Sequence, residues 1–393
     1  MKKKTFVIII VSIFLVLNAL SFLTINLKTG TSLFNNGEYL EKKKSFLIKQ
    51  PVDKYVHPFI GQIDLNNFSV TENDLTNEKL FYNIYESSNN SDDILKILLL
   101  GSSTAINFSN NTIYAYDLEK KRDSKESYNI LAKKIETVFP KKKIIFYNAA
   151  IRSSKQPQQL FKLYYLYLLG MNFDIVINFD GPLEIAHPYL KNFPINDEAI
   201  YPRRYSDELA ALTRDISCVK TNNEEVNKNS YVPLIELFSY LKIRNCYKKI
   251  TKKEGIKNNW KSFTSIKEQD KEEILENSYK IWRNSSLEIE NFSQLKNFFY
   301  LHVISPNQHV KKSKKFSEEE KNYLSYEYTE IISEYYERLV NFENLKLKNS
   351  LDLKYIFKDI KKTVYRDSCC RFNDLGIQII SEEIANHLKL RFN

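Results

Sequence analysis

A serine, a histidine and an aspartate stand at positions where they could do acyl-transfer chemistry together. Ser103 follows an apolar run that ends in Gly101-Ser102, His309 lies just past the apolar run 298–304, and Asp367 lies near the C-terminus. Acyl transfer by a serine needs a base for the hydroxyl proton, an acid that orients this base, and donors for the oxyanion. These residue types match that requirement, although Ser103 on its own would be interpreted as a helix N-cap.

The segments that carry these residues belong to a pattern of short apolar runs and helical stretches over residues 93–393. Short apolar runs that end in turn residues are typical of buried parallel strands. Strand and helix in alternation predict an α/β fold, a doubly wound parallel sheet. The expected strands are 94–100, 143–147, 174–179, 298–304 and a last one just before residue 367, and the expected helices are 125–138, 156–169, 317–340 and 376–390.

The loops after these strands are the first place to look for a ligand. In an open α/β sheet, ligands bind outside the carboxyl ends of the strands. The loops expected at that edge are 101–103, 148–150, 180–184 and 305–309, and the segment 367–371 has to join them if the fold is correct.

Motifs in four of these segments, taken in order, resemble the catalytic blocks of the SGNH (GDSL-type) hydrolases. Gly101-Ser102-Ser103 resembles the family's Gly-Asp-Ser, and Ala150 stands at the Gly position of the second block. The third block, Gly-x-Asn-Asp, is similar to Gly181–Glu184, and Asp367 matches the acid of Asp-x-x-His. The segments 57–61, 155–160, 179–184, 201–205 and 305–308 resemble a membrane-anchored bacterial branch of the family, so that the likeness runs from about residue 55 to the end.

This resemblance implies an SGNH/flavodoxin-like fold and roles for individual residues. Ser103 would be the nucleophile and Asp367 the acid, while the backbone around Gly101, Ser103 and Ala150 would hold the oxyanion. The implied substrates are ester-linked acyl groups of envelope glycans.

Two substitutions depart from the family pattern. Leu183 stands where the family has its Asn donor, and loss of one such donor typically costs ~3 kcal/mol of transition-state stabilisation. Arg371 stands where the family has its His base. Because arginine stays protonated and has no acceptor lone pair, Arg371 cannot remove the serine proton.

The residues leave three hypotheses open for this site. A degenerate site would bind an acylated or acidic glycan without turnover, with Arg371 holding a carboxylate or phosphate. Alternatively another base has replaced the lost histidine, for which His309 is the first candidate and Glu184 the second. In the third hypothesis Ser103 is a helix N-cap, Asp367 and Arg371 form a local ion pair, and the site is an inherited scaffold.

The N-terminus predicts a single-pass membrane anchor. Lys2, Lys3 and Lys4 precede the uncharged run 6–27, and 22 helical residues span ~33 Å, which is enough for a bilayer core. Basic residues before the run place the N-terminus in the cytoplasm and the body outside it, in the periplasm or at the cell surface. A cleaved signal peptide is the alternative.

Three regions are expected from this pattern. They are the anchor at 1–28, a stalk with a packed strap at 29–92, and the SGNH-like domain at 93–393 with a helical insertion at about 200–298.

Composition limits the partners and cofactors. The net charge of +10 comes mostly from lysines that are dispersed along the chain. The sequence contains no recognisable nucleic-acid-binding module, so no nucleic-acid partner is expected. The cysteines Cys218, Cys246, Cys369 and Cys370 allow two disulfides in three pairings, or buried free thiols. They do not have the spacing of a zinc site, and neither a metal nor a cofactor is expected.

Overall fold

The computed structural model divides into two compact units, each considered by itself. Unit 1 comprises Met1–Asp53 with Ser206–Trp260, and unit 2 comprises Lys54–Tyr205 with Lys261–Asn393. The structure describes residues 3–29, 32, 34, 38–39, 54–57, 61–64, 80–109, 129–151, 153–195, 198–200, 232–238, 241, 270–322, 324, 332–333, 347–368 and 370–392. Within these ranges, the side chains of 3–10, 28–29, 54–57, 61–64, 191 and 195 lie outside the description.

A six-stranded sheet forms the centre of unit 2, with the strand order β3-β5-β4-β6-β7-β8. Only β3 runs antiparallel to its neighbour, β5, and every other pair in this sheet is parallel. The parallel strands therefore have the order 2-1-3-4-5, which is a doubly wound order. The strands are β3 (Asn83–Glu86), β4 (Ile94–Gly101), β5 (Lys143–Asn148), β6 (Ile175–Asp180), β7 (Phe299–Ile304) and β8 (Ser350–Asp352).

The sequence predicts the four inner strands correctly and the last one incorrectly. The strands β4, β5, β6 and β7 match their predicted ranges to within a residue at each end. The last parallel strand is β8, however, and not a segment just before Asp367. Tyr365 forms only an isolated antiparallel bridge with Phe372.

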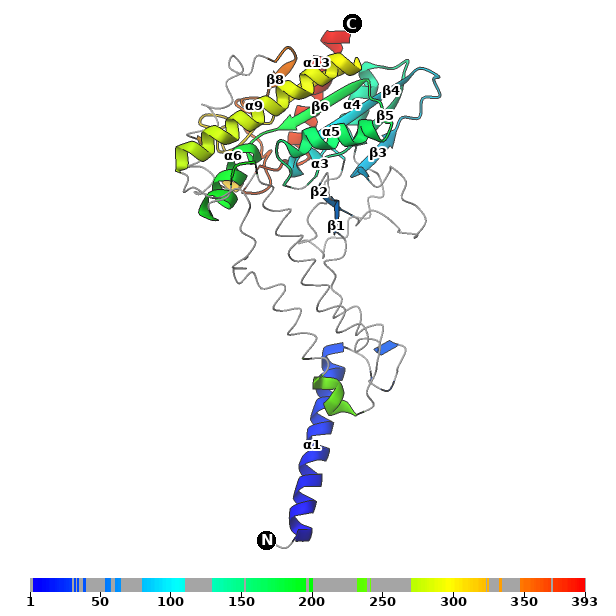
Figure 1. The fold of residues 1–393 in the computed structure, drawn as a ribbon, viewed down its shortest axis with the longest axis vertical. Coiled ribbons are helices and arrows are strands. Elements are labelled where there is room, and N and C mark those ends of the chain that lie inside the picture. Colours follow the sequence, from blue (N-terminus) through cyan, green and yellow to red (C-terminus); the bar gives the residue numbers. More distant parts are fainter. Residues whose placement is uncertain are drawn as a thin grey trace. The chain divides into compact units, whose positions relative to one another are not determined.

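Helices cover both faces of this sheet (Figure 1). On one face α4 (Ile130–Val138) and α13 (Asp374–Phe392) pack in the same apolar cluster as Leu95, Ile97 and Leu99 of β4. On the other face α5 (Gln158–Leu168) and α9 (Lys271–Lys296) pack with Leu98 and Leu100. Because successive side chains of a strand point to opposite faces, β4, which is apolar except for Lys96, serves both layers.

The helix termini follow ordinary capping chemistry. The helix α9 lies in the predicted insertion and begins at Asp270, whose carboxylate accepts from Glu273 N. It ends at Asn297 in the left-handed conformation. Residues 201–231 and 242–269 of that insertion lie outside the described residues. The predicted helix 376–390 corresponds to α13, whose apolar face is buried through Ile377, Ile380, Ile384 and Leu388.

Shorter elements complete unit 2. Between the longer ones lie α3 (Ser103–Ile106), α6 (Leu183–His187), the turns η2 (Pro188–Asn192) and η3 (Phe193–Ile195), and α10 (Glu318–Lys321). A hairpin of β1 (Lys54–His57) and β2 (Gly61–Asp64) forms a separate two-stranded sheet.

In unit 1 the helix α1 (Lys3–Thr29) packs with a short helical segment, 232–238. The Leu234 N–H donates to Asn18 Oδ1 at 3.2 Å. The buried Tyr39 donates its hydroxyl hydrogen to Glu236 Oε1 at 2.9 Å and packs with Ile25. Over the part of the chain that could be searched, no helix is both long and apolar enough to cross a membrane.

Candidate functional site

Ser103 lies where the strand order reverses, at the carboxyl end of β4 between β5 and β6. It is the first residue of α3, and the N-cap is Ser102, whose hydroxyl makes no capping hydrogen bond. Ser102 instead shares a hydrogen bond of 3.1 Å with Thr104 Oγ1. Ser103 is half-buried and follows the N-cap position, so its hydroxyl group does not cap α3, and it lies where this fold class binds ligands.

Gly101 makes this turn possible. Its φ is +152°, and a Cβ atom there would lie 2.6 Å from Ala105 Cβ and 2.7 Å from Phe179 O. No other residue type fits between β6 and α3 without a shift of the backbone. Gly101 therefore sets the direction in which the chain leaves β4 toward Ser103.

Ala150 lies beside this turn, but its amide is already in use. Ile151 N–H donates to Gly101 O at 3.1 Å, which joins the second predicted block to the first. The Ala150 N–H donates to Asn148 Oδ1 at 3.0 Å. In this arrangement the Ala150 amide is not directed at an oxyanion, in contrast to the role that the resemblance implies.

His309 lies against the segment that carries Asp367. Its Nε2 is 2.9 Å from Ser368 O, and Gln308 Nε2 donates to Asp367 O at 2.8 Å. A carbonyl oxygen only accepts, so His309 Nε2 carries a proton and Nδ1 is the acceptor of the neutral ring. The main chain is held as well, because His309 N–H donates to Asn307 Oδ1 at 2.8 Å.

Burial of His309 lowers its pKa, although the hydrogen bond to Ser368 and the charge of Asp367 act in the opposite direction. The imidazole is therefore neutral at pH 7, which is the form that accepts a proton.

Asp367 and Arg371 form an ion pair through Oδ2 and Nε, four residues apart. The other carboxylate oxygen, Oδ1, accepts from Cys370 N at 3.0 Å and from Arg371 N at 3.3 Å. Cys370 is itself disulfide-bonded, and the other three cysteines lie outside the described residues. The local ion pair anticipated from the sequence is therefore present. The same carboxylate also accepts hydrogen bonds from the main chain of the loop that follows it.

A buried ion pair fixes the His309 segment relative to the Asp367 segment. Glu320 and Lys314 lie 2.8 Å apart with almost no exposure. The same carboxylate accepts from Ser317 N at 3.0 Å, Val364 N at 2.8 Å and Tyr365 N at 3.1 Å. Ser317 and Glu320 also form a capping box at the start of α10, so Glu320 both caps this helix and joins two segments.

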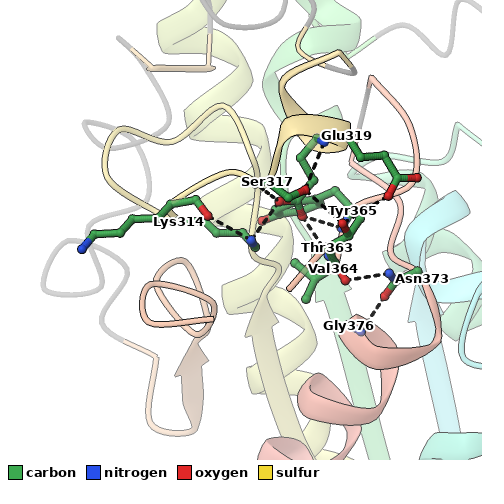
Figure 2. Close-up of polar contacts among 10 residues, drawn as sticks. Lys314, Ser317, Glu319, Thr363, Val364, Tyr365, Asn373 and Gly376 are labelled. Atoms are coloured by element: carbon green, nitrogen blue, oxygen red, sulfur yellow. Dashed lines mark hydrogen bonds and ion pairs between the residues drawn. The ribbon is translucent and has the colours of Figure 1, made fainter. Parts of the chain in front are cut away.

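The contact continues to α13 through Asn373 (Figure 2). Asn373 Nδ2 donates to Thr363 O at 2.7 Å, and its Oδ1 accepts from Gly376 N at 3.0 Å. The segments on both sides of Asp367 are thus held, and the position of the loop relative to His309 is fixed by main-chain hydrogen bonds.

Glu184 belongs to a third, buried cluster. Its carboxyl group accepts from Gln156 N at 2.7 Å and Gln159 Nε2 at 3.3 Å. Burial and the charge of Asp180 raise its pKa well above the usual value, against the opposing effect of Lys155. A raised pKa favours the protonated carboxyl group, which is not a base, so the structure favours His309 over Glu184.

Sequence reasoning missed most of the cluster around Asp180. Its Oδ2 accepts from Asn178 Nδ2 at 2.6 Å and Trp282 Nε1 at 3.1 Å. His302 Nε2 lies 3.7 Å from the same oxygen, in the buried position expected of a core histidine. The partners come from β6 itself, from β7 and from α9, and only Asp180, at a strand end, gave a sequence signal.

The seven candidate residues thus form three local groups, all in unit 2. Gly101, Ser103 and Ala150 lie together, and so do His309, Asp367 and Arg371, while Glu184 lies with Asp180. Within the described ranges, Ser103 makes no hydrogen bond to His309 or Asp367. No protein-family model matches the chain, and no curated protein matches it with significant sequence similarity.

Proposed function

We propose that the chain is an SGNH-type serine esterase or acyltransferase in which His309 is the base that Arg371 cannot be. One observation carries this proposal, namely the 2.9 Å contact between His309 Nε2 and Ser368 O beside Asp367. A nucleophile whose base is oriented by a third group is the general arrangement for activating a serine. In this chain the orienting group is a main-chain carbonyl instead of a carboxylate.

The proposed reaction has two steps. Ser103 Oγ attacks the ester carbonyl while His309 Nδ1 takes the hydroxyl proton, and the same proton then goes to the departing alcohol. Water or an acceptor hydroxyl next attacks the acyl-enzyme and releases Ser103. The Ser103 N–H is available as an oxyanion donor. Because catalytic hydrogen bonds are often long before substrate binds, the missing Ser103–His309 hydrogen bond is compatible with this route.

The same proposal places the protein at the cell envelope as a single-pass membrane protein, with its N-terminus in the cytoplasm. The support is that α1 has 27 residues, ~40 Å of helix, and that side chains such as Ile13, Phe14 and Leu15 are exposed. Its polar residues Ser21 and Thr24 donate to the carbonyls four residues earlier, which lowers the cost of an apolar environment. Acylated envelope glycans are the proposed substrates, on the resemblance and this location alone.

The test is hydrolysis of a small activated acetate ester by the full-length protein. The variants are Ser103→Ala and His309→Gln, and His387→Gln, a half-buried histidine of α13, is the matched control. We expect loss of at least ~100-fold in the first two and none in the control. Equal hydrolysis rates for the wild type and Ser103→Ala would refute the proposed enzymatic activity.

A non-catalytic, glycan-binding envelope protein is the second candidate. Two contacts favour this candidate. Asp367 pairs with Arg371 and the Ala150 amide donates to Asn148, so that both groups are already bound within their own segments. This candidate requires no hydrolysis by the wild type, together with binding of an acylated or acidic glycan that Arg371→Ala weakens.

A further inference from the structure

Lys162, on the inner face of α5, carries a buried amine near the Ser103 turn. Lys162 is 3% exposed, and its Nζ donates to Ala149 O at 2.7 Å. A lysine is almost never fully buried without an anionic partner, because its charge loses hydration there. The described residues provide no carboxylate that opposes this cost, and burial lowers the pKa of Lys162 to about 7.

The carbonyl that Lys162 holds belongs to the turn beside the nucleophile. Ala149 N–H continues the β4–β5 ladder through Leu99 O at 2.8 Å. Two residues later, Ile151 N–H donates to Gly101 O at 3.1 Å. The Ala149 carbonyl lies between these two bonds, so its direction determines how the chain passes Gly101 on its way from β5.

The far end of the same loop is held by a second buried group. Glu184 accepts the Gln156 N–H at 2.7 Å, just before α5 begins. The loop from Ala149 to Pro157 is therefore fixed at its start by Lys162 and near its end by Glu184. Both contacts join a buried ionisable side chain to the main chain. The contact of Lys162 is stronger than one between neutral groups while its amine is protonated.

The other ionisable groups around α5 act elsewhere. Glu184 of α6 contacts Gln159, Glu288 of α9 acts on Tyr164, and Asp174, which precedes β6, acts on Tyr167. Packing of α5 alone would be better served by a leucine or methionine at position 162, since each is apolar and neutral.

We propose that Lys162 is a positioning residue for the Ser103 site, which it serves by fixing the Ala149 carbonyl and with it the turn that contacts Gly101. The expected effect of Lys162 on ester hydrolysis rests on the proposed function. Its expected effect on the turn rests on the contacts alone. Lys162 does not touch the reacting atoms.

The first readout of the test does not need activity. Amide hydrogen exchange of Ile151 is compared in the full-length wild type, Lys162→Met, Lys162→Arg and the control Lys133→Met, a lysine exposed on α4. We expect the Ile151 amide to exchange about tenfold faster in Lys162→Met, because this variant lacks the hydrogen bond to Ala149 O that holds the turn. Lys162→Arg, which keeps a charged donor, restores most of the protection. Unchanged exchange in Lys162→Met would overturn the proposal.

The second readout is ester hydrolysis by the same proteins between pH 6 and 9. We expect kcat of Lys162→Met to fall about tenfold or more with little change in KM, because displacement of the turn affects the reacting geometry. The wild-type kcat declines as Lys162 loses its charge above pH 7, and Lys162→Arg shows no such decline. Equal kcat values and equal pH profiles would contradict the positioning role.

The two readouts separate the two proposals. A wild type without hydrolysis would refute the proposed function, while the exchange of Ile151 would still decide the role of Lys162. If Lys162→Met does not fold, the wild type is compared with Lys162→Arg. The protection of the Ile151 amide against hydrogen exchange is then measured as a function of pH and corrected for the intrinsic pH dependence of exchange. We expect it to decline above pH 7 in the wild type and not in Lys162→Arg. Identical pH profiles of the two proteins would overturn the inference.

Discussion

The His309 ring and the carbonyl of Ser368 are joined by a 2.9 Å hydrogen bond, which seats the imidazole beside the Asp367 loop. This bond leaves Nδ1 as the acceptor nitrogen of the neutral ring. The segment after β7 and the segment before α13 are 59 residues apart in the chain. Their contact brings the proposed base and the group that orients it together beyond the carboxyl end of β7.

The first prediction concerns the pH dependence of hydrolysis. Burial lowers the pKa of His309 below its usual value of 6.5, against the effects of Ser368 and Asp367. A base works only without its proton, so kcat/KM falls as the pH drops through this lowered pKa. The profile of kcat/KM between pH 4.5 and 7 should have its midpoint below 6.5, and a midpoint above that value would exclude His309 as the base.

The second prediction concerns the histidine base of the family pattern, which this chain replaces with Arg371. Arg371→His adds an imidazole four residues after Asp367, where the carboxylate now binds a guanidinium group. We expect the ester hydrolysis rate to rise about tenfold, which is below the full effect of a well-placed general base. Arg371→Lys is the control, because it keeps the charge and adds no base. If both variants behave alike, the site does not use an imidazole at this position.

The third prediction concerns the ion pair that holds the two segments together. Glu320→Gln leaves Lys314 charged in a site where both side chains are almost unexposed, so we expect a loss of ~3 kcal/mol in the free energy of unfolding. Glu318→Gln removes the exposed pair with Lys321 and should cost less than ~1 kcal/mol. Chemical denaturation measures both, and equal losses would show that burial does not strengthen this pair.

The same pair predicts how stability changes with pH. Burial alone would raise the pKa of Glu320, but the hydrogen bonds from Lys314, Val364, Ser317 and Tyr365 lower it overall. A carboxyl group with a lowered folded-state pKa contributes stability that is present above its ordinary value of 4.5 and is lost as the pH falls through the folded-state pKa. The Glu320→Gln variant should lose less stability than the wild type on acidification below pH 4.5.

Apolar patterning was sufficient to predict the inner part of the sheet. The strands β4, β6 and β7 are largely buried on both faces, so their sequences are mainly apolar, and Lys96, Asn178 and His302 are polar exceptions within them. The edge strands β3 and β8 have four and three residues. Segments this short carry no measurable period, and β8 pairs only with β7. The last strand was therefore predicted at a wrong position, just before Asp367.

The candidate site was predictable in its residue types and not in its contacts. The order of loops along the sheet placed Ser103 and Ala150 together, because β4 and β5 are neighbours in any doubly wound sheet that starts this way. The bonds of Asp180 to Trp282, 102 residues away, and of Lys162 to Ala149 depend on helix placement. Side-chain patterns do not encode such placement, and a buried lysine in an apolar helix face gives no sign of its acceptor.

The last prediction concerns the glycine that precedes the nucleophile. In Gly101→Ala the new methyl group would lie 2.6 Å from Ala105 Cβ and 2.7 Å from Phe179 O, at a φ of +152°. Strain and overlap together should lower the free energy of unfolding by ~3 kcal/mol or more. Gly170→Ala is the matched control, since its φ is +84° and nothing lies within 4 Å of the added atom, so that strain alone costs ~1–2 kcal/mol. Thermal or chemical unfolding measures the difference. The esterase rate of the folded fraction should fall in Gly101→Ala only, because the turn that aims Ser103 has shifted, and a larger effect in Gly170→Ala would contradict the role given to Gly101.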